Sequence, residues 1–324
     1  MVQVVLPNTK IKNLPFYLAT EEYVAKYLDN RDYFFMWQVN PTVIIGRNQL
    51  IDTEVNISFC KKNNISIFRR KSGGGSVYSD YKNIMCSYIT NRKGVNGTFN
   101  YYLDKMTDIL LSLGIPAEKN GRNDILINGR KVSGNSFYKS GGKSIVHGTM
   151  LFDTDLEPLV KSLTPSNDKL VSKGIASVRE RVTKLSEYTN LSIEEFKNYI
   201  LQKLCSGTVQ LGNNALEAIE VIEREYYTNN FIYNNNPPYT IKNCTRTANA
   251  GSIEARIELK NNIIRNIHLY GDFFTGSEIE NTILSKLIGT EYTLKALNRV
   301  LSGYVVEKHI IGLKKSELIS LIIS

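Results

Sequence analysis

Residues 69–80, RRKSGGGSVYSD, place two arginines immediately before a run of three glycines. Because glycine has no Cβ, its backbone N–H groups can approach a ligand closely, and Arg69 and Arg70 add charge that suits an anion. Val77 and Tyr78 favour a strand, so the glycines join strand to strand and match neither a Walker loop nor a dinucleotide fingerprint. Taken alone, the segment predicts either an anion-binding loop or a loose surface turn.

A second polar segment, residues 121–137 (GRNDILINGRKVSGNSF), contains a predicted β-hairpin. Asn128-Gly129 is the preferred two-residue turn, because both turn positions need a positive φ. Lys131 and Ser133 follow the turn and alternate, so we expect them on one face, with Asp124 roughly opposite Ser133 on the preceding strand. A lysine on an exposed strand is ordinarily only solvated, but a second segment of this kind in one chain favours a functional site.

A third polar segment, residues 163–185 (LTPSNDKLVSKGIASVRERVTKL), combines Gly174 with several basic residues. Its pattern fits a short amphipathic helix. It fits a basic loop over a phosphate equally well, and the residues alone do not decide between the two.

The elements that must position these segments follow from apolar spacing and turn residues. A helix is expected at 13–29, with Asn13 as its cap, and another at 102–114, ended by Gly114. A third helix, at 191–204, starts with a Ser-x-x-Glu capping box. Strands are expected at 33–39, 42–46, 65–70, 84–90 and 144–152. The hairpin and the glycine turn at 140–143 predict an antiparallel meander, so we expect an α+β fold whose mixed, largely antiparallel sheet is flanked by helices.

A domain boundary is expected in the Asn- and Pro-rich stretch at 227–239. Beyond it, residues 251–274 alternate like a hairpin and are followed by helical patterns. This division gives a larger domain at 1–240 and a smaller α+β domain at 241–324. The length of 324 residues is also that of about two domains.

Composition limits the classes of function. The net charge of +9 comes from 40 basic and 31 acidic residues that are mixed along the chain. This pattern gives little support to nucleic-acid binding and suits an acidic small molecule or an acidic protein partner. The four cysteines have no metal or redox spacing, and we expect no disulfides. No signal peptide and no apolar stretch of about 20 residues is evident, so we expect a cytoplasmic protein without a membrane segment.

The three polar segments, in this order, resemble the signature segments of the lipoate–protein ligase family. Residues 69–80 are similar to its lipoate loop, residues 121–134 to its Asn-Asp strand and adenylate lysine, and residues 173–185 to its adenylate-binding loop. FYLATEE at 16–22 and MWQVNPTVIIGRNQ at 36–49 also match. The resemblance is close over about residues 13–190, and five ordered motifs make chance agreement improbable.

The resemblance implies an activity and a fold. Similar ligases join lipoate to ATP, giving lipoyl-AMP and pyrophosphate, and then pass the lipoyl group to a lysine of an acceptor protein. It implies a catalytic lipoate- and ATP-binding domain at 1–240, with a sheet shared with biotin protein ligases, and an accessory domain at 241–324. It also implies Mg²⁺ with the ATP. The implied acceptors are lipoyl domains of 2-oxoacid dehydrogenases or the glycine-cleavage H protein, and we expect a monomer.

The resemblance also assigns residues by position. Lys131 is expected to be the catalytic residue, lying between the carboxylate and the α-phosphate, and Asp124 is the candidate Mg²⁺ ligand. The residues expected to contact ATP or the adenylate are Arg70, Gly75, Ser76, Val77, Tyr78, Lys131, Ser133, Gly174, Ser177 and Val178. The residues expected to contact lipoate are Trp37, Arg70, Ser72, Gly73, Gly74, Lys131 and His147.

One departure from the family pattern keeps alternatives open. The family usually has histidine where this chain has Ser79, and a hydroxyl cannot take over acid–base work from an imidazole. A non-enzymatic lipoate or adenylate binder therefore remains an alternative. A cofactor-free acyltransferase would need an activated cysteine, but no cysteine lies between Cys86 and Cys205. Pyrophosphate release separates a ligase from both.

Overall fold

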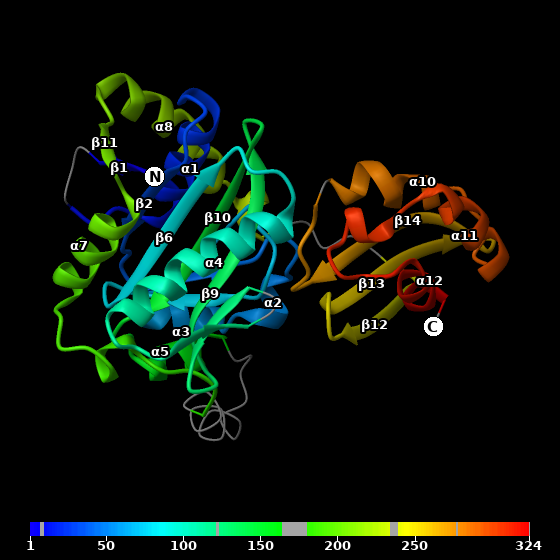
Figure 1. The fold of residues 1–324 in the computed structure, drawn as a ribbon. Coiled ribbons are helices and arrows are strands. Elements are labelled where there is room, and N and C mark those ends of the chain that lie inside the picture. The colour runs from blue at the N-terminus through cyan, green and yellow to red at the C-terminus, as the bar shows by residue number, and fades with distance from the viewer. Residues whose placement is uncertain (7–9, 121–122, 164–179, 234–238, 277, 324) are drawn as a thin grey trace. The chain divides into compact units, whose positions relative to one another are not determined.

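The computed structural model describes residues 1–6, 10–120, 123–163, 180–233, 239–276 and 278–323 (Figure 1). The chain forms two compact units. The N-terminal unit comprises Met1–Ile45, Asp52–Arg70 and Val77–Ile232. The C-terminal unit comprises Gly46–Ile51, Lys71–Ser76 and Tyr233–Ser324. Two short segments from the first quarter of the chain therefore pack with the C-terminal unit.

The N-terminal unit is built around an eight-stranded sheet of the order β11-β1-β2-β6-β10-β9-β8-β7 (Figure 1). In this order the strands span Gly207–Gln210, Val2–Val5, Tyr33–Trp37, Asn83–Thr90, Lys143–Leu151, Arg130–Ser140, Asp124–Ile127 and Ala117–Lys119. From β2 to β7 all neighbours are antiparallel, whereas β1 is parallel to both β2 and β11. The predicted meander corresponds to the run from β7 to β10.

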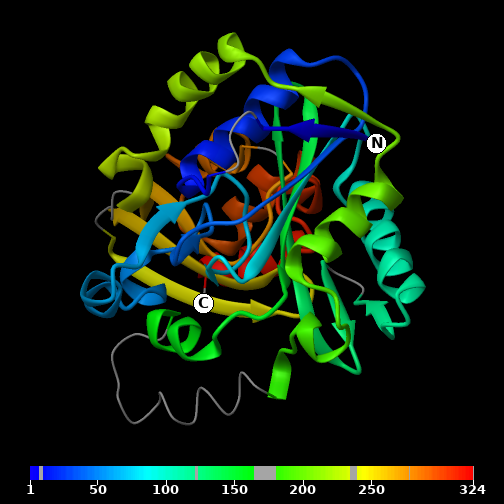
Figure 2. The ribbon, with the colours of Figure 1, turned by 90° about the vertical axis from the view of Figure 1, so that its left-hand side faces the viewer.

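Helices cover both faces of this sheet. Helix α1 (Leu14–Tyr27) packs on one face, and α4 (Val95–Ser112) packs on the other, where Phe99 contacts Phe137 of β9 (Figure 2). In the described ranges the other helices of this unit are α2 (Ile51–Glu54), α3 (Ile57–Lys62), α5 (Leu156–Leu163), η1 (Leu185–Glu187), α7 (Ile193–Leu204), α8 (Asn213–Tyr226) and α9 (Asn229–Tyr233). Helix α7 carries the predicted capping box, in which Ser192 accepts from the backbone of Glu195.

A second, three-stranded sheet of the order β4-β3-β5 completes the N-terminal unit. Strand β3 (Thr42–Ile45) is parallel to β4 (Ser66–Arg69) and antiparallel to β5 (Val77–Ser79). The backbone N–H of Arg70 donates to the carbonyl of Ile45 at 2.9 Å, which extends the β3–β4 pairing by one residue. Both arginines of the first motif therefore stand at a strand end.

The C-terminal unit contains an antiparallel sheet of β12 (Ile241–Thr247), β13 (Gly251–Lys260) and β14 (Ile263–Gly271). Its helices are η2 (Glu280–Leu284), α10 (Ser285–Leu287), α11 (Leu294–Val300), η3 (Leu301–Gly303), η4 (Val306–Lys308) and α12 (Lys315–Ile323). Ile253, Ile267, Leu297 and Leu318 belong to an apolar core of its own. The alternation at 251–274 thus predicted the β13–β14 hairpin correctly.

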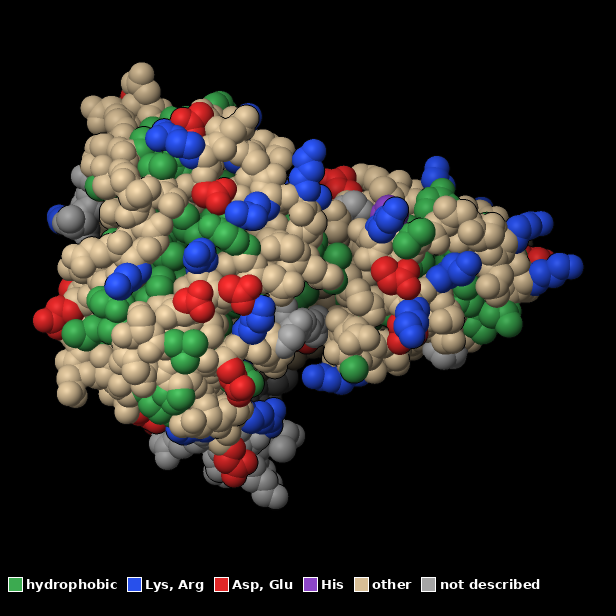
Figure 3. Space-filling view, viewed as in Figure 1, with side chains coloured by type: hydrophobic (Ala, Val, Ile, Leu, Met, Phe, Trp, Pro, Cys, Tyr) green, Lys and Arg blue, Asp and Glu red, His purple; other side chains and the backbone are tan. Residues whose placement is uncertain are grey.

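The sequence-based fold class is confirmed: a mixed, largely antiparallel sheet flanked by helices accompanies a smaller α+β unit. Asn128 and Gly129 have φ of 51° and 74°, as the predicted turn requires. Asn13 occupies the N-cap of α1, but its side chain makes no capping hydrogen bond. None of the helices in the described ranges is long and apolar enough to cross a membrane. On each unit, the face in view carries interspersed charges of both signs (Figure 3).

Candidate active site

A row of paired residues crosses the large sheet from Trp37 to Asp124. Trp37 pairs with Met85, Met85 with Thr149, Thr149 with Gly134, and Gly134 with Asp124. Directly paired residues project to the same face of a sheet. The side chains of Trp37 and Asp124 therefore share one face, although they come from distant strands and motifs.

A second row lies two residues further along each strand, on the same face. It joins Phe35, Ser87, His147 and Ser136. Helix α1 covers this face, because its Glu21 lies 2.9 Å from His147 Nδ1. His147, predicted to contact lipoate, is thus on the face that holds Trp37, and it is only 4% exposed.

Five buried side chains form a polar cluster here, which we call the Glu21 network: Glu21, Trp37, Ser87, Tyr138 and His147. Trp37 Nε1 donates to Ser87 Oγ at 2.8 Å, and Ser87 Oγ donates to Glu21 Oε1 at 2.5 Å. Tyr138 OH donates to Glu21 Oε2 at 2.9 Å. Burial, followed by the charge of Glu21, raises the pKa of Tyr138 far above its usual value, so this phenol stays a donor.

The indole of Trp37 is also held by an aromatic neighbour. It stacks on Tyr17 of α1, with ring centroids 4.6 Å apart and planes 12° from parallel. Both rings border a cavity of about 700 Å³ that Met36, Gln38 and Lys197 also line. Trp37 thus borders open space within the N-terminal unit, with 3% of its surface exposed.

Lys131 reaches the same face through a β-bulge. The β8–β9 register shifts between Ile125 and Leu126, so that Lys131 pairs with Leu126. Its Nζ lies 2.9 Å from Asp124 Oδ1, and a Cβ on Gly134 would lie 2.7 Å from the same Nζ. The ammonium therefore lies over Gly134, within the row described above. With 40% of its side chain exposed, Lys131 remains accessible to a ligand.

The bulge overturns one expectation about the hairpin. Ser133 pairs with Ile125 and Met150, not with Asp124, and these partners belong to the opposite face. The extra residue in the bulge reverses the alternation between Ser133 and Lys131. The two residues therefore do not share a face, as simple alternation predicted, whereas Asp124 and the Lys131 ammonium do lie together.

The two arginines of the first motif are buried at the end of β4. Arg69 Nε donates to the carbonyls of Phe231 and Ile232, and Arg70 Nη1 donates to that of Ile44 at 3.2 Å. Burial, with a smaller effect of the Arg69 charge, lowers the pKa of Arg70 to about 9. An anionic ligand would offset the cost of placing two guanidinium groups here.

The strand that follows the glycines is held tightly. Tyr78 is 4% exposed and pairs with Val43, and burial raises the pKa of its phenol well above the usual value. Val77 is half-buried and packs against the apolar cluster that contains Tyr17 and Trp37. The predicted adenylate residues on β5 are therefore part of the scaffold next to the Trp37 face.

The glycine run itself belongs to the C-terminal unit. A Cβ on Gly73 would lie 2.3 Å from the carbonyl oxygen of Phe273, and Gly74 has a φ of 88°. Gly73 is thus required by packing within the unit, and Gly74 by its left-handed backbone. A Cβ on Gly75 would meet no described atom within 4 Å. Of the three glycines in this run, Gly75 is the one whose missing side chain is not explained by a described neighbour or by a left-handed backbone.

Two serines flank the glycines. The carbonyl of Ser72 accepts from the backbone N–H of Arg47 at 2.8 Å, and Ser76 Oγ donates to Gln49 Oε1 at 2.8 Å. These bonds join residues 71–76 to residues 46–51 within the C-terminal unit. The loop is therefore shaped by its own contacts.

The remaining site predictions have separate outcomes. Gly174, Ser177 and Val178 lie outside the described residues. Ser79, which replaces the family histidine, is fully buried and accepts from Asn83 Nδ2 at 3.2 Å. Within the described ranges, no group of three or more His, Cys, Asp or Glu side chains could hold a metal ion.

The cysteines have no thiolate character. Cys86 pairs with Met36 and Gly148, so its side chain points away from the Trp37 face, and burial raises its pKa to about 12. Burial likewise raises the pKa of Cys60 to about 11. Since the thiolate is the nucleophile, neither residue suits an acyl-enzyme mechanism.

Sequence reasoning gave no role to Glu21 or Ser87. Glu21 was visible within a quoted motif, and its spacing from Tyr17, Leu18 and Val24 places it on the apolar stripe of α1. An acid on a buried stripe is a signal, because such a group needs partners. Ser87 sits in an otherwise apolar strand and gave a weaker signal.

Comparisons with known proteins point to one family. A family model described as the lipoyl protein ligase A/B catalytic domain matches residues 13–205, and one described as the bacterial lipoate protein ligase C-terminus matches residues 236–322. A Bacillus subtilis protein named lipoate-protein ligase LplJ is 34% identical over 332 residues, covering 98% of this chain and 99% of its own.

Solved structures share the fold. P. falciparum LipL1 in complex with lipoate has a TM-score of 0.79 at 20% identity and covers 99% of both chains. A lipoate-protein ligase A bound with ATP has a TM-score of 0.60 at 23% identity and covers 72% of this chain and 97% of its own. Together with the family models and the near full-length relative, these likenesses show that the chain belongs to the lipoate–protein ligase family.

Proposed function

We propose that this chain activates lipoate with ATP and transfers the lipoyl group to a lysine of an acceptor protein. In the first step, a lipoate carboxylate oxygen bonds to the α-phosphorus of ATP, and pyrophosphate leaves. In the second step, the acceptor amine attacks the acyl carbon of lipoyl-AMP, an amide forms, and AMP leaves with the acyl–oxygen bond broken. The amine proton is released.

The observation that carries the proposal is the position of the Lys131 ammonium. It lies on the same sheet face as Trp37 and His147 and is 40% exposed. A fixed positive charge there offsets the repulsion between a carboxylate and an α-phosphate. Trp37 would supply the apolar wall for the acyl chain, and Arg70 a second charge for the anions.

Lys131 would contribute to both steps for one physical reason. Each transition state places negative charge on oxygens around the mixed anhydride, and a preorganised ammonium stabilises that charge without rearranging. The ion pair with Asp124, at 2.9 Å, holds the ammonium in place before substrate arrives. Asp124 thus serves as a positioning residue for Lys131.

Asp124 also fits the role of a Mg²⁺ ligand. Mg²⁺ that accompanies a nucleotide usually takes only one or two protein carboxylates, with phosphates and water completing the octahedron. The side chain of Asp124 is 21% exposed and lies beside the proposed phosphate position. Bound there, the ion would neutralise phosphate charge.

The same proposal extends to the remaining predicted contacts. Gly75, Ser76, Val77 and Tyr78 would border ATP, together with Gly174, Ser177 and Val178 of the third motif, whereas Ser133 is buried on the opposite face of the sheet. Ser72, Gly73 and Gly74 would border lipoate. In this scheme residues 1–240 form the catalytic domain and residues 241–324 the accessory domain.

Acidic acceptor proteins suit the charge of this chain. A net charge of +9 would favour encounter with a lipoyl domain or a glycine-cleavage H protein that presents its lysine on an acidic turn. The experiment is mass spectrometry of such acceptors after incubation with the chain, lipoate, ATP and Mg²⁺. We expect one acceptor lysine to gain a lipoyl group only when all components are present.

Two controls separate the alternatives. An acceptor whose target lysine is changed to arginine should stay unmodified. Pyrophosphate should appear with lipoate and ATP even without acceptor. Modification without ATP would indicate an acyltransferase, and binding of lipoate without pyrophosphate release would indicate a binder.

A further inference from the structure

Ser87 lies at the centre of the Glu21 network. It is fully buried on β6, with 0% exposure. Its hydroxyl accepts from Trp37 Nε1 at 2.8 Å and donates to Glu21 Oε1 at 2.5 Å. Nothing in the family motifs or in the proposed chemistry uses this residue.

The direction of the two hydrogen bonds is fixed by chemistry. An indole nitrogen can only donate, so Ser87 Oγ accepts from Trp37, and the serine proton is left for Glu21 Oε1. Ser87 has one proton and gives it to Glu21, so its lone pair must face the indole. The carboxylate therefore orients the serine, and the serine orients the tryptophan.

We propose that Ser87 is a positioning residue that fixes the indole of Trp37 and thereby sets which acyl chains the site accepts. The proposal rests on the proposed function, in which Trp37 lines the acyl pocket. The Tyr17 stack, at 4.6 Å, fixes the plane of the ring, and the Ser87 bond fixes its rotation within that plane. The indole is thus held at two points.

An oriented aromatic wall discriminates between acyl groups of similar length. Lipoate ends in a five-membered disulfide ring, which is wider and more polarisable than the end of a straight alkyl chain. Contacts between sulfur and an aromatic ring depend on where the sulfur meets the ring. Octanoate has no such contact, so its binding should respond less when the indole rotates.

The test compares Ser87→Ala with the wild-type chain. Trp37 is the single tryptophan of the chain, so fluorescence reports this indole alone. We expect Ser87→Ala to shift the emission to longer wavelength and to raise the KM for lipoate about tenfold, because a buried N–H loses its partner. The kcat should change less than about twofold, and the KM for octanoate less than about threefold.

Ser144→Ala is the matched control. Ser144 is a buried serine of β10 in the same sheet, and its hydroxyl donates to the carbonyl of Arg92 at 2.8 Å. The change removes one hydrogen bond of similar length three residues from His147, on the opposite face of the sheet. We expect unchanged Trp37 emission and an unchanged ratio of the KM values for lipoate and octanoate.

A second variant covers the case in which Ser87→Ala does not fold. Trp37→Phe removes the indole N–H and keeps the bond from Ser87 to Glu21. It should lose preference for lipoate over octanoate to a similar degree. In the double variant, adding Ser87→Ala to Trp37→Phe should change the preference for lipoate over octanoate by less than about twofold, since the two residues act as one unit.

The proposal would be overturned if Ser87→Ala kept the wild-type emission and the wild-type ratio of the KM values for lipoate and octanoate. It would also be overturned if the effects of the two single changes on that ratio were fully additive in the double variant. Failure of the proposed function has a different signature. In that case the wild-type chain would release no pyrophosphate with either acid, and the idea that Trp37 selects acyl chains would fall with it. The emission shift of Ser87→Ala would still measure the hydrogen bond itself.

Discussion

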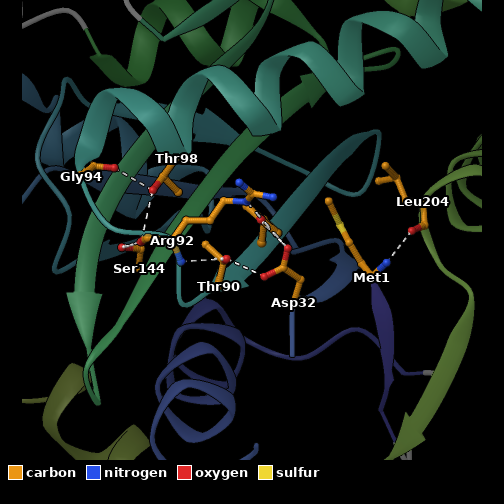
Figure 4. A network of polar contacts seen from close by, with 9 residues as sticks. Met1, Asp32, Thr90, Arg92, Gly94, Thr98, Ser144 and Leu204 are labelled. Carbon is orange, nitrogen blue, oxygen red and sulfur yellow. Dashed lines mark hydrogen bonds and ion pairs between the residues drawn. The ribbon is translucent and has the colours of Figure 1, made fainter. Parts of the chain in front are cut away.

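The large sheet of the N-terminal unit holds two polar networks, each built around one carboxylate. In the Asp32 network, Asp32 Oδ1 accepts from Thr90 at 2.5 Å, Asp32 Oδ2 accepts from Tyr88 at 2.8 Å, and Arg92 lies 4.0 Å away (Figure 4). Its acid is 29% exposed. In the Glu21 network the acid is completely buried, and among the described residues it contacts His147, Ser87 and Tyr138.

The networks differ in what they hold. The hydroxyl of Thr90 accepts from the backbone N–H of Arg92, and the carbonyl of Arg92 accepts from Ser144 (Figure 4). Arg92 lies just before α4, whose N-cap is Gly94. This network secures a chain segment. The Glu21 network holds side chains, and those belong to the face that carries Lys131. A buried acid is costly unless its partners are complete, so its use here suggests a role beyond folding.

The largest expected effect comes from Lys131→Ala. It should lower adenylation and transfer from supplied lipoyl-AMP by at least about 10²–10³, because one preorganised charge is lost. Stability should hardly change, since the side chain is 40% exposed and fills no core. Single-turnover assays of each step, beside a urea titration, give the answer.

Lys119→Ala is the control for Lys131. It removes the ammonium of another ion pair, in which Lys119 of β7 in the same sheet lies 2.5 Å from Asp104 of α4. Both rates should stay within about twofold of wild type, because exposed pairs contribute little. Rates of Lys131→Ala within about tenfold of wild type would remove the residue from the mechanism.

The glycine loop gives a second, smaller contrast. Gly75→Ala should lower ATP–pyrophosphate exchange at least about tenfold, or roughly 1.4 kcal/mol. Its thermal midpoint should stay unchanged, because the added Cβ would meet no described atom within 4 Å. Gly74→Ala should destabilise the chain by about 1–2 kcal/mol, because φ is 88°. Normal exchange in Gly75→Ala would mean that this position only forms a turn.

Thr90→Val tests the structural network. Thr90 is fully buried, and the change removes its bonds to Asp32 and to the Arg92 backbone. We expect a loss of about 2 kcal/mol in the free energy of unfolding, measured by urea titration. The kcat for pyrophosphate release should stay within about twofold. A large loss of activity in the folded variant would erase the distinction between the networks.

The smallest effect is expected for Ser79→Ala. Ser79 is fully buried and accepts one hydrogen bond from Asn83, so it cannot exchange protons with a ligand. Pyrophosphate release should change less than about threefold across pH 6–9. A loss near that of Lys131→Ala would mean that the hydroxyl takes part in the chemistry.

Much of this arrangement could be predicted from local patterns. The Asn128-Gly129 turn and the Ser192 capping box appear as expected, because both depend on residues next to one another. The bulge beside Lys131 could not be foreseen, since it depends on how β8 pairs with β9. For the same reason, alternation placed Ser133 on the wrong face.

The features that could not be predicted depend on contacts between residues far apart in the sequence. The packing of residues 46–51 and 71–76 with the C-terminal unit depends on backbone contacts such as Gly73 against Phe273, which no spacing rule encodes. The Glu21 network joins four strands to one helix, so only the register shows that Ser87 and His147 are neighbours. Of the two members that sequence reasoning missed, Glu21 gave the stronger signal, as an acid on an apolar stripe, and Ser87 the weaker one.

The most direct test of the central claim is ATP–pyrophosphate exchange with and without lipoate. The wild-type chain and Thr90→Val should catalyse exchange only when lipoate is present, and Lys131→Ala should be at least about a hundredfold slower. Exchange that is absent from the wild type, or that does not depend on lipoate, would contradict the proposed activity. Exchange by Lys131→Ala at the wild-type rate would contradict the site.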